Sequence, residues 1–351
     1  MGHKHWYEAV DRSLRDVRRK PDVPFGGLTV LFSGEWKQIL PVVKHGGRIQ
    51  IIDASLKRSY LWQFVTELTL SKNMRLSSQA ENIGFASYLI ELGQGLIPIL
   101  KDLGDFKIKI PDDLLHPSTD LKELCHFVFE GLSTNYKDGS WLCSRAIIAS
   151  TNINVDQINA FMMEQFPGDK KVYKSCDTVT ENEHQYPLEF INRLSPSGLP
   201  PHELVFKKHS SIMLLRNLDP ANGHCNGTRY YILELHEHII EAVVAYGAHA
   251  GKKLFIPRIP LKPSEFDFPF DMKRKQFPVR PAFGITANKS QGQTLNRIGI
   301  YLSQEMFSHG QNYVAQSRVS SKADLKIMAP NGTYSRKIGI YCDNVVWTEI
   351  L

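Results

Sequence analysis

Apolar residues recur at helical spacing near the start of the chain. Trp6, Val10, Leu14 and Val17 lie three or four positions apart, and arginines occupy much of the remaining surface before Pro21. This period is typical of a helix that buries one face and exposes the other. The pattern therefore predicts an amphipathic helix with a loop after it.

Two short apolar runs come after the predicted helix. Residues 28–32 come after a glycine pair and end at Gly34, a pattern that favours a parallel strand buried on both faces. Residues 64–70 predict a second short strand, which leads to Arg75. Periodic apolar positions then predict a helix over residues 77–92. Together these elements indicate an α/β lobe.

The rest of the chain predicts a connection and a second α/β lobe. Residues 94–139 are acidic and proline-punctuated, and they contain a predicted helix near 121–129. A strand at 146–149 and a helix at 155–166 open the second lobe. Short β-rich runs come next at 212–215 and 230–233, and strands around Val243, Phe255, Phe283 and residues 298–302 are expected to return to the parallel sheet.

Basic and aromatic residues alternate just before a polar segment. Residues 252–280 contain eight basic residues against three acidic ones, and Phe255, Phe266, Phe268, Phe270 and Phe277 are interleaved with them. Such a stretch can follow a sugar-phosphate backbone and offer rings to bases. The alternative is a proline-rich crossover whose aromatic residues are core and whose charges are solvated.

Overall composition narrows the class of protein only modestly. Lys and Arg exceed Asp and Glu by 42 to 36, which is compatible with nucleic acid as a partner. The five cysteines are scattered without a Cys-x-x-Cys pair, so we expect no zinc site and no disulfide framework. No apolar stretch approaches the length of a membrane span. We therefore expect a nuclear or cytosolic protein with no metal site built from its cysteines and histidines.

Two motifs near the carboxyl end carry candidate chemistry. Residues 280–294 read as a strand that delivers a series of phosphate-binding groups onto a glycine: Thr286, Asn288, Lys289, Ser290, Gln291 and Gly292. The second motif, at residues 313–321, places Arg318 behind small and apolar residues. A guanidinium fork on a packed helix suits neutralisation of the charge that develops on a transferred phosphoryl group.

These two motifs resemble the fifth and sixth signature motifs of superfamily-one DNA helicases of the petite-integration-frequency type, in the version found in Helitron transposons. Four further segments resemble that family in the expected order: residues 25–43, residues 68–75, residues 149–159 and the Asn-Gly-Thr-Arg run at 226–229. Glu35 stands where relatives carry Asp. The resemblance covers nearly the whole chain.

The resemblance implies an α/β fold of RecA-like helicase lobes with parallel sheets, the first lobe incomplete, plus a small SH3-like β insertion. It divides the chain into the remainder of the first lobe (1–93), a connection (94–140) and the second lobe (141–351), which contains the insertion, called 2B in the family, at 189–234.

The resemblance also assigns roles to individual residues. Gln38 is implied to sense the γ-phosphate or attacking water, Arg75 and Arg318 to be arginine fingers, and Gln291 and Gly292 to approach the phosphates of ATP. The residues implied to contact single-stranded DNA are Thr151, Asn152, Thr286, Asn288, Lys289 and Ser290. The alternative to these functional roles is a structural one, in which Gln38 caps a turn and the two arginines pair with carboxylates.

Two motifs that the family needs for ATP and Mg²⁺ do not occur in the sequence. A phosphate loop reads Gly-x-x-x-x-Gly-Lys-Ser/Thr, and the metal needs an Asp-Glu pair at a strand end. The nearest approach, at Gly251, has lysine where the metal-binding hydroxyl should stand. Residues 1–8 resemble the segment immediately after the Asp-Glu pair in relatives. We therefore expect a helicase that lacks its amino-terminal part.

Three functions remain open from the sequence. The first is a fragment of an ATP-dependent helicase that moves 5′→3′ along single-stranded DNA, with roles in repair, recombination or transposon replication. The second is a non-enzymatic remnant that only binds single-stranded nucleic acid. The third is a structural or regulatory protein that pairs with a separate chain or upstream segment supplying the missing loop.

Overall fold

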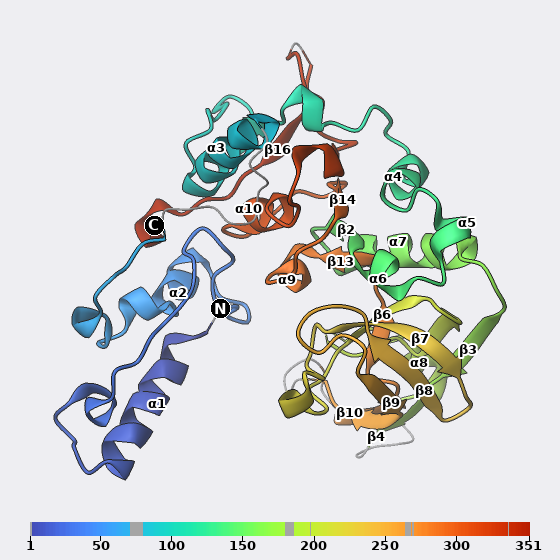
Figure 1. Cartoon of the computed structure of the whole chain (residues 1–351), viewed down its shortest axis with the longest axis horizontal. Helices are drawn as coiled ribbons and strands as arrows, with labels where there is room; N and C mark the ends of the chain where they lie inside the picture. Colours follow the sequence, from blue (N-terminus) through green and yellow to red (C-terminus); the bar gives the residue numbers. More distant parts are fainter. Residues whose placement is uncertain are drawn as a thin grey trace. The chain divides into compact units, whose positions relative to one another are not determined.

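The computed structural model describes residues 2–70, 80–179, 186–196, 198–263, 268, 270–335 and 337–351. Contacts divide the chain into two compact units. Unit 1 consists of residues 1–115, 290–293 and 302–351, and unit 2 consists of residues 116–289 and 294–301. Figure 1 labels many of the helices and strands of both units. The domain bounds implied by the family resemblance stay a prediction.

Unit 1 begins with the predicted amphipathic helix. Its regular elements are α1 (Lys4–Val17), α2 (Arg48–Asp53), α3 (Ala80–Gln94), β1 (Lys107–Lys109), α10 (Gln311–Gln316), β15 (Leu325–Met328) and β16 (Tyr341–Asp343). Strands β1 and β16 pair antiparallel, which brings the carboxyl-terminal segment beside residues 107–109. The predicted helices α1 and α3 are both present. The prediction that α1 buries its apolar face is wrong, because Trp6, Val10 and Val17 are 66%, 52% and 77% exposed.

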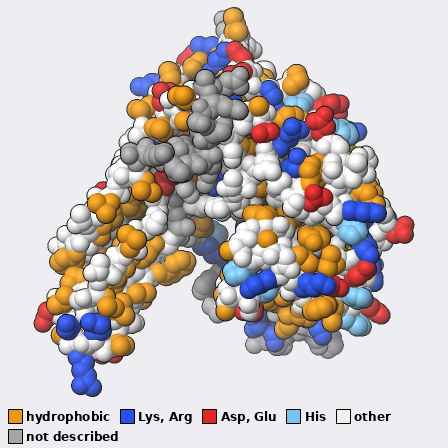
Figure 2. Space-filling model, viewed as in Figure 1, with side chains coloured by type: hydrophobic (Ala, Val, Ile, Leu, Met, Phe, Trp, Pro, Cys, Tyr) orange, Lys and Arg blue, Asp and Glu red, His pale blue; other side chains and the backbone are white. Residues whose placement is uncertain are grey.

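The two apolar runs predicted to be strands in unit 1 are not strands. Residues 28–32 and 65–70 have no regular structure, and Leu31 is 88% exposed while Leu70 is 98% exposed. A strand is stable only when neighbours satisfy its backbone N–H and C=O groups. Within the described residues no strand pairs with either run. Figure 2 shows hydrophobic side chains spread over the part of unit 1 that contains α1.

Unit 2 has a parallel sheet at its centre. Strand β2 (Arg145–Ala149) pairs in parallel with β13 (Gly284–Thr286) on one side and with β14 (Arg297–Tyr301) on the other. The side chains from Ala146 to Ala149 are fully buried, as the continuous apolar run predicts. The helices beside this sheet are α4 (Leu121–Val128), α6 (Gly139–Cys143) and α7 (Asn152–Gln165), and α5 (Leu132–Asn135) and α9 (Ala287–Ser290) are short.

Antiparallel sheets make up the rest of unit 2. The largest has the order β12-β6-β7-β8-β9, and smaller ones pair β10-β11-β4 and β3-β5. Their bounds are β3 Lys170–Lys174, β4 Cys176–Val179, β5 Glu203–Lys207, β6 Ser211–Leu214, β7 Arg229–Leu235, β8 Ile239–Val244, β9 Lys253–Pro257, β10 Ile259–Leu261, β11 Met272–Gln276 and β12 Val279–Pro281, with helix α8 at Leu188–Arg193.

Two predicted strands belong to a different sheet from the one expected. The strands around Val243 and Phe255 do not return to the parallel sheet, because β8 and β9 continue the antiparallel sheet that β6 and β7 begin. Short connections between alternating strands favour this antiparallel pairing, whereas a parallel return needs a crossover. Only the strands near Phe283 and residues 298–302 join β2 in parallel, as predicted.

Arg229 ties the antiparallel sheet to the parallel one inside unit 2. The buried guanidinium donates hydrogen bonds to the carbonyls of Cys143, Arg145 and Ala282 at 2.8, 2.9 and 2.6 Å. These carbonyls lie just before or at the start of β2 and just before β13. The arginine of the Asn-Gly-Thr-Arg run therefore helps to fix the positions of these two parallel strands.

Candidate nucleic-acid and nucleotide sites

Strands β2 and β13 of unit 2 end at the same edge of the parallel sheet. Thr286 is in register with Ala149, two residues before Thr151. Thr151 is the residue before α7, and Asn152 begins that helix. Ligands of open α/β sheets bind at the carboxyl ends of strands, where helix amino termini also attract anions. The structure therefore brings Thr151, Asn152 and Thr286 to one edge.

Two polar atoms near this edge have no hydrogen-bond partner. They are Oγ1 of Thr151 and Nδ2 of Asn154, and Asn154 is a buried residue in the first turn of α7. A buried polar group without a partner costs about 1–3 kcal/mol, and a hydrogen bond to a ligand at this edge would remove that cost. The sequence did not indicate Asn154.

Lys289 is the basic centre of this edge. Its Nζ donates to Oδ1 of Asn226 at 2.6 Å, and its backbone N–H reaches Oγ1 of Thr286 at 3.4 Å. Burial lowers the pKa of Lys289, and the positive charges of Arg216 and Arg280 lower it further. Asn226 also donates its backbone N–H to Oδ1 of Asn217, the residue after Arg216, at 2.8 Å, so the segment that carries Arg216 lies beside Lys289. Positive charges gathered in this way favour a bound anion.

Each arginine of this basic cluster is held by an observed contact. Arg216 donates to the carbonyl of Gly198 at 2.9 Å, and Arg280 lies 3.3 Å from a carboxylate oxygen of Asp156. Sequence reasoning gave Arg216 and Asn226 no role at a site. The only available signal was their position beside turns that come after β6 and before β7.

The other predicted DNA contacts differ in exposure. Asn288 is exposed next to Lys289, so its amide is accessible. Ser290 is fully buried, so a direct contact from its hydroxyl to DNA stays a prediction that its burial disfavours. Asn152 is exposed at the start of α7.

A hydrogen-bonded network in unit 1 joins two of the predicted nucleotide-binding residues. Nε2 of Gln291 donates to Oε1 of Gln38 at 3.0 Å, and Nε2 of Gln38 donates to Oε2 of Glu35 at 3.2 Å. Tyr313 donates its hydroxyl proton to Oε1 of Glu35 at 2.9 Å, and Nζ of Lys37 lies 3.2 Å from the same oxygen. The structure therefore brings Gln38 and Gln291 together around one carboxylate.

The Glu35 carboxylate stays ionised in this network. Burial acts to raise its pKa, but the hydrogen bonds from Gln38, Tyr313 and Lys37 outweigh burial and lower the pKa below its ordinary value. The sequence pointed to Glu35 as a departure from the family Asp, whereas the contribution of Tyr313 was not recognised. A signal was available, because Tyr313 opens the same motif as Arg318.

His309 and Gly310 hold the segment that carries Gln38. The backbone N–H of Trp347 donates to Nδ1 of His309 at 2.9 Å, so Nδ1 accepts and Nε2 carries the proton that is donated to the Trp36 carbonyl at 2.8 Å. Gly310 has φ +73°, and a Cβ there would lie 2.4 Å from the carbonyl oxygen of Lys37. Only glycine fits this close approach.

Arg318 is buried and bonded to the chain around it. Its side chain is 1% exposed, and it donates to the carbonyls of Val314 and Gln293 at 2.7 and 3.1 Å and to the Ser317 hydroxyl at 2.7 Å. These three partners are carbonyl and hydroxyl oxygens, and the role of Arg318 as an arginine finger stays a prediction. Gly292 is exposed with φ +80°. Arg75 lies outside the described residues.

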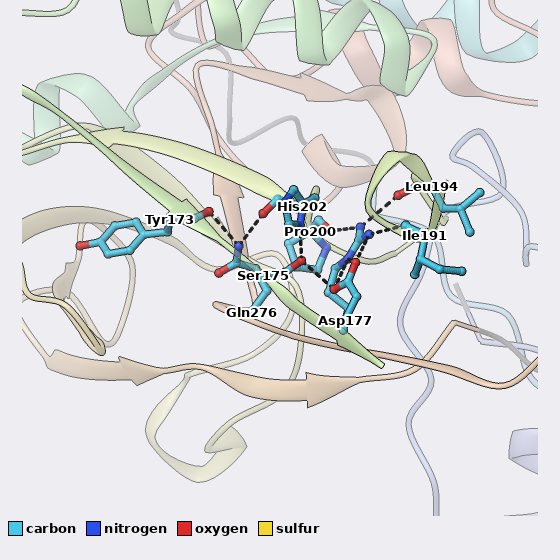
Figure 3. Close-up of polar contacts among 9 residues, drawn as sticks. Tyr173, Ser175, Asp177, Ile191, Leu194, Pro200, His202 and Gln276 are labelled. Atoms are coloured by element: carbon cyan, nitrogen blue, oxygen red, sulfur yellow. Dashed lines mark hydrogen bonds and ion pairs between the residues drawn. The ribbon is translucent and has the colours of Figure 1, made fainter. Parts of the chain in front are cut away.

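The basic run at 252–280 is only partly available to a ligand. Arg274 and Asp177 are both fully buried and form an ion pair at 2.6 Å, and Arg274 also donates to carbonyls of Ile191, Leu194 and Pro200 (Figure 3). The prediction that Arg274 belongs to a basic run open to solvent is therefore wrong, because its side chain is buried in this ion pair.

The aromatic residues of this run divide in the same way. Phe277 is fully buried, and Phe268 and Phe270 pack against a small core of Val179, Ile191 and Met272. Phe255 is exposed, and Phe266 lies outside the described residues. The core alternative thus holds for three of the five phenylalanines.

Several of the predicted nucleotide-binding side chains are bonded to other groups of the chain. The amides of Gln38 and Gln291 bond one another, and the Arg318 fork is turned into backbone carbonyls. The sequence contains no phosphate loop that would supply a cradle of backbone amides. Across the described ranges no helix is long and apolar enough to cross a membrane.

Comparison with known proteins identifies relatives of both units. The model of PIF1-like helicases matches residues 1–102, and the model of the DNA helicase Pif1 2B domain matches residues 189–235. The ATP-dependent DNA helicase PIF1 of Xenopus laevis is 24% identical over 93% of this chain and 45% of its own length. The corresponding Bdellovibrio bacteriovorus protein is 23% identical over 92% of this chain and 63% of its own length.

Solved structures show the same fold. The crystal structure of Bacteroides Pif1 bound to ssDNA superposes with a TM-score of 0.64 at 21% identity, covering 94% of this chain and 68% of that one. The Pif1 helicase of Candida albicans gives a TM-score of 0.57 at 21% identity, covering 93% and 70%. The fold is thus RecA-like α/β. One family model matches a segment of each unit, and the relatives match along nearly the whole length of the chain, so the chain is similar to PIF1-like helicases.

Proposed function

We propose that unit 2 binds the phosphate backbone of single-stranded DNA at the carboxyl ends of β2 and β13. The main observation behind this proposal is the basic cluster of Lys289, Arg216 and Arg280 at this edge. Two further features support the proposal: the start of α7 presents a positive dipole end, and Oγ1 of Thr151 has no hydrogen-bond partner. The solved Bacteroides Pif1 relative is bound to ssDNA.

A matched pair of lysine variants tests this site. Binding of fluorescent oligo-dT to Lys289→Ala is compared with binding to Lys122→Ala, which removes an exposed lysine on α4. Each neutralised phosphate on single strands contributes about −0.7 to the slope of log K against log salt. Lys289→Ala should flatten the slope by about 0.7 and weaken binding roughly tenfold at low salt, while Lys122→Ala should behave as wild type.

Two results would contradict the DNA site. The first is a wild-type chain that shows no salt-sensitive binding to oligo-dT at low ionic strength. The second is a Lys289→Ala variant that binds like the Lys122→Ala control and keeps an unchanged circular dichroism spectrum.

We assign the chain to a larger activity through its family. In this proposal it is part of an ATP-dependent 5′→3′ DNA helicase of the Helitron-like branch, serving repair, recombination or transposon replication. The Xenopus and Bdellovibrio relatives that support it carry the name ATP-dependent DNA helicase, and this chain spans less than two thirds of the length of either. The Glu35, Gln38 and Gln291 network would then report the nucleotide state to Tyr313 and the helix that carries it.

ATP hydrolysis by the chain alone should not exceed a trace. Transfer of the γ-phosphoryl group needs backbone amides, a lysine and metal-binding groups that the sequence does not supply. The purified chain should show background phosphate release with or without oligo-dT in a coupled assay. Robust DNA-stimulated turnover that disappears in Arg318→Ala would contradict this.

A second candidate function is that of a structural or regulatory subunit, in which another segment or a separate chain completes the first lobe. Leu31, Leu68 and Leu70 favour it, because these leucines are 88%, 84% and 98% exposed in runs with strand-like sequence. Pairing with additional strands would bury them. Co-expression with an upstream segment that carries a phosphate loop should restore ATP hydrolysis in a stable complex. Absence of complex formation would leave DNA binding alone as the function.

A further inference from the structure

A second basic feature of unit 2 is an open pocket of about 480 Å³ at the far end of α7. It is lined by residues of three loops and by the start of β3, including Lys137, Lys170, Lys171, Lys208 and His209. We refer to this feature as the lysine pocket. Helix α7 begins at the DNA edge and ends just before the pocket, and its fourteen residues span about 20 Å.

Positive charge dominates the lining. Four lysines face one acidic residue, Asp169, within the pocket. Lys208 is neutralised by Glu234, and Nζ of Lys171 donates to the Leu235 carbonyl at 3.0 Å. The other two of the four lysines are therefore available as donors.

Lys137 and Lys170 are both exposed at this pocket. Lys137 has its Nζ 5.5 Å from the centre of the Tyr136 ring, and in the described part of the chain neither lysine forms an ion pair or a side-chain hydrogen bond. An ammonium group that is not paired with a carboxylate is a suitable partner for a phosphate, which it binds as a point charge.

His209 gives independent support for a ligand. Its backbone has φ +70°, a conformation that is uncommon for a residue other than glycine and that concentrates at functional sites. Its Nδ1 atom is buried without a hydrogen-bond partner. Burial, together with the charges of Lys208 and Lys137, lowers the pKa of His209, so the ring is neutral and one of its nitrogens carries a proton to donate.

We propose that the lysine pocket is a second phosphate-binding site, which holds the backbone of the same nucleic acid about 20 Å from the start of α7 at the DNA edge. In this proposal Lys137 and Lys170 supply the charge, and the His209 ring, which lines the pocket and has an unpartnered Nδ1, supplies a polar contact. This inference rests on the proposed DNA-binding function. At about 3.4 Å per stacked nucleotide, roughly six nucleotides connect the two sites.

Charge-matched double variants test the proposal on the full chain. Lys137→Ala/Lys170→Ala removes the two available pocket lysines, and Lys101→Ala/Lys122→Ala removes two exposed lysines elsewhere. With oligo-dT of about twenty nucleotides, the pocket variant should flatten the log-log salt slope by about 1.4. Wild-type affinity should then fall about sevenfold more than that of the variant between about 50 and about 200 mM salt. The control should match wild type.

The outcomes separate this inference from the proposed function. If the pocket variant matches its control while Lys289→Ala is impaired, the pocket inference fails and the DNA edge stands. If the wild type does not bind oligo-dT, both fail. A third arm measures binding of inorganic phosphate by phosphorus NMR: phosphate that shifts only with an intact pocket, without any change in the oligo-dT slope, would overturn the nucleic-acid assignment. Equal melting temperatures of all variants exclude unfolding as the cause.

Discussion

The buried ion pair between Arg274 and Asp177 should be a major determinant of the stability of unit 2. Replacing Arg274 by Met keeps much of the volume but removes the guanidinium. Asp177 then loses three hydrogen bonds of 3.0, 3.0 and 2.6 Å and keeps one from the Ser175 hydroxyl at 2.6 Å. Three carbonyls also lose a hydrogen bond, although the Ile191 carbonyl keeps the one from the Leu194 N–H at 3.1 Å.

The size of the effect depends on the burial of both partners. Removing one member of a buried pair leaves an uncompensated charge and costs about 3–5 kcal/mol. A substitution on an exposed position usually changes stability by about 0.5 kcal/mol or less. Lys275→Met, one residue away on an exposed position of β11, is therefore the matched control. We expect Arg274→Met to be lower in unfolding free energy than Lys275→Met by about 3–5 kcal/mol.

Urea unfolding monitored by circular dichroism measures this difference, and hydrogen exchange on peptides from β4 and β11 locates it. The double variant Arg274→Met/Asp177→Leu should be less destabilised than Arg274→Met alone, because it removes the buried charge as well. The reasoning is refuted if Arg274→Met and Lys275→Met unfold at the same urea concentration. It is also refuted if the protection of β4 and β11 is unchanged in Arg274→Met.

Two further predictions concern unit 1. Gly310→Ala should destabilise unit 1 by at least about 2 kcal/mol, because the alanine adds a left-handed backbone strain of about 1–2 kcal/mol and a clash with the Lys37 carbonyl. The control is Gly292→Ala, which is also at positive φ but has open space around it and therefore carries only the strain. Equal melting temperatures of the two variants would contradict the clash. Burial lowers the pKa of His309 from its usual 6.5, so its stabilising contribution is present above pH 6.5 and is lost as pH falls through the lowered pKa. His309→Gln keeps one donor and one acceptor and should flatten the decline of stability below that pH, whereas His126→Gln, an exposed control, should not; identical pH profiles of His309→Gln and wild type would exclude the effect.

Local pattern determined much of the secondary structure. Apolar spacing predicted helix α1, and a continuous apolar run predicted β2, which is a fully buried strand. These elements are predictable because a helix satisfies its own backbone groups and because β2 has neighbours on both sides within this chain. The run at residues 28–32 is similarly apolar but has no strand beside it among the described residues, so sequence alone could not distinguish the two.

The candidate sites show the same division between local and long-range information. The sequence motifs pointed to Lys289, Gln38 and Gln291 through their resemblance to the helicase family, and the roles of these residues stay predictions. Only the tertiary structure decided that Arg216 joins Lys289 and that Arg274 is buried in an ion pair. The physical reason is that charge and burial depend on neighbours contributed by distant segments, and no local pattern of residues specifies those neighbours.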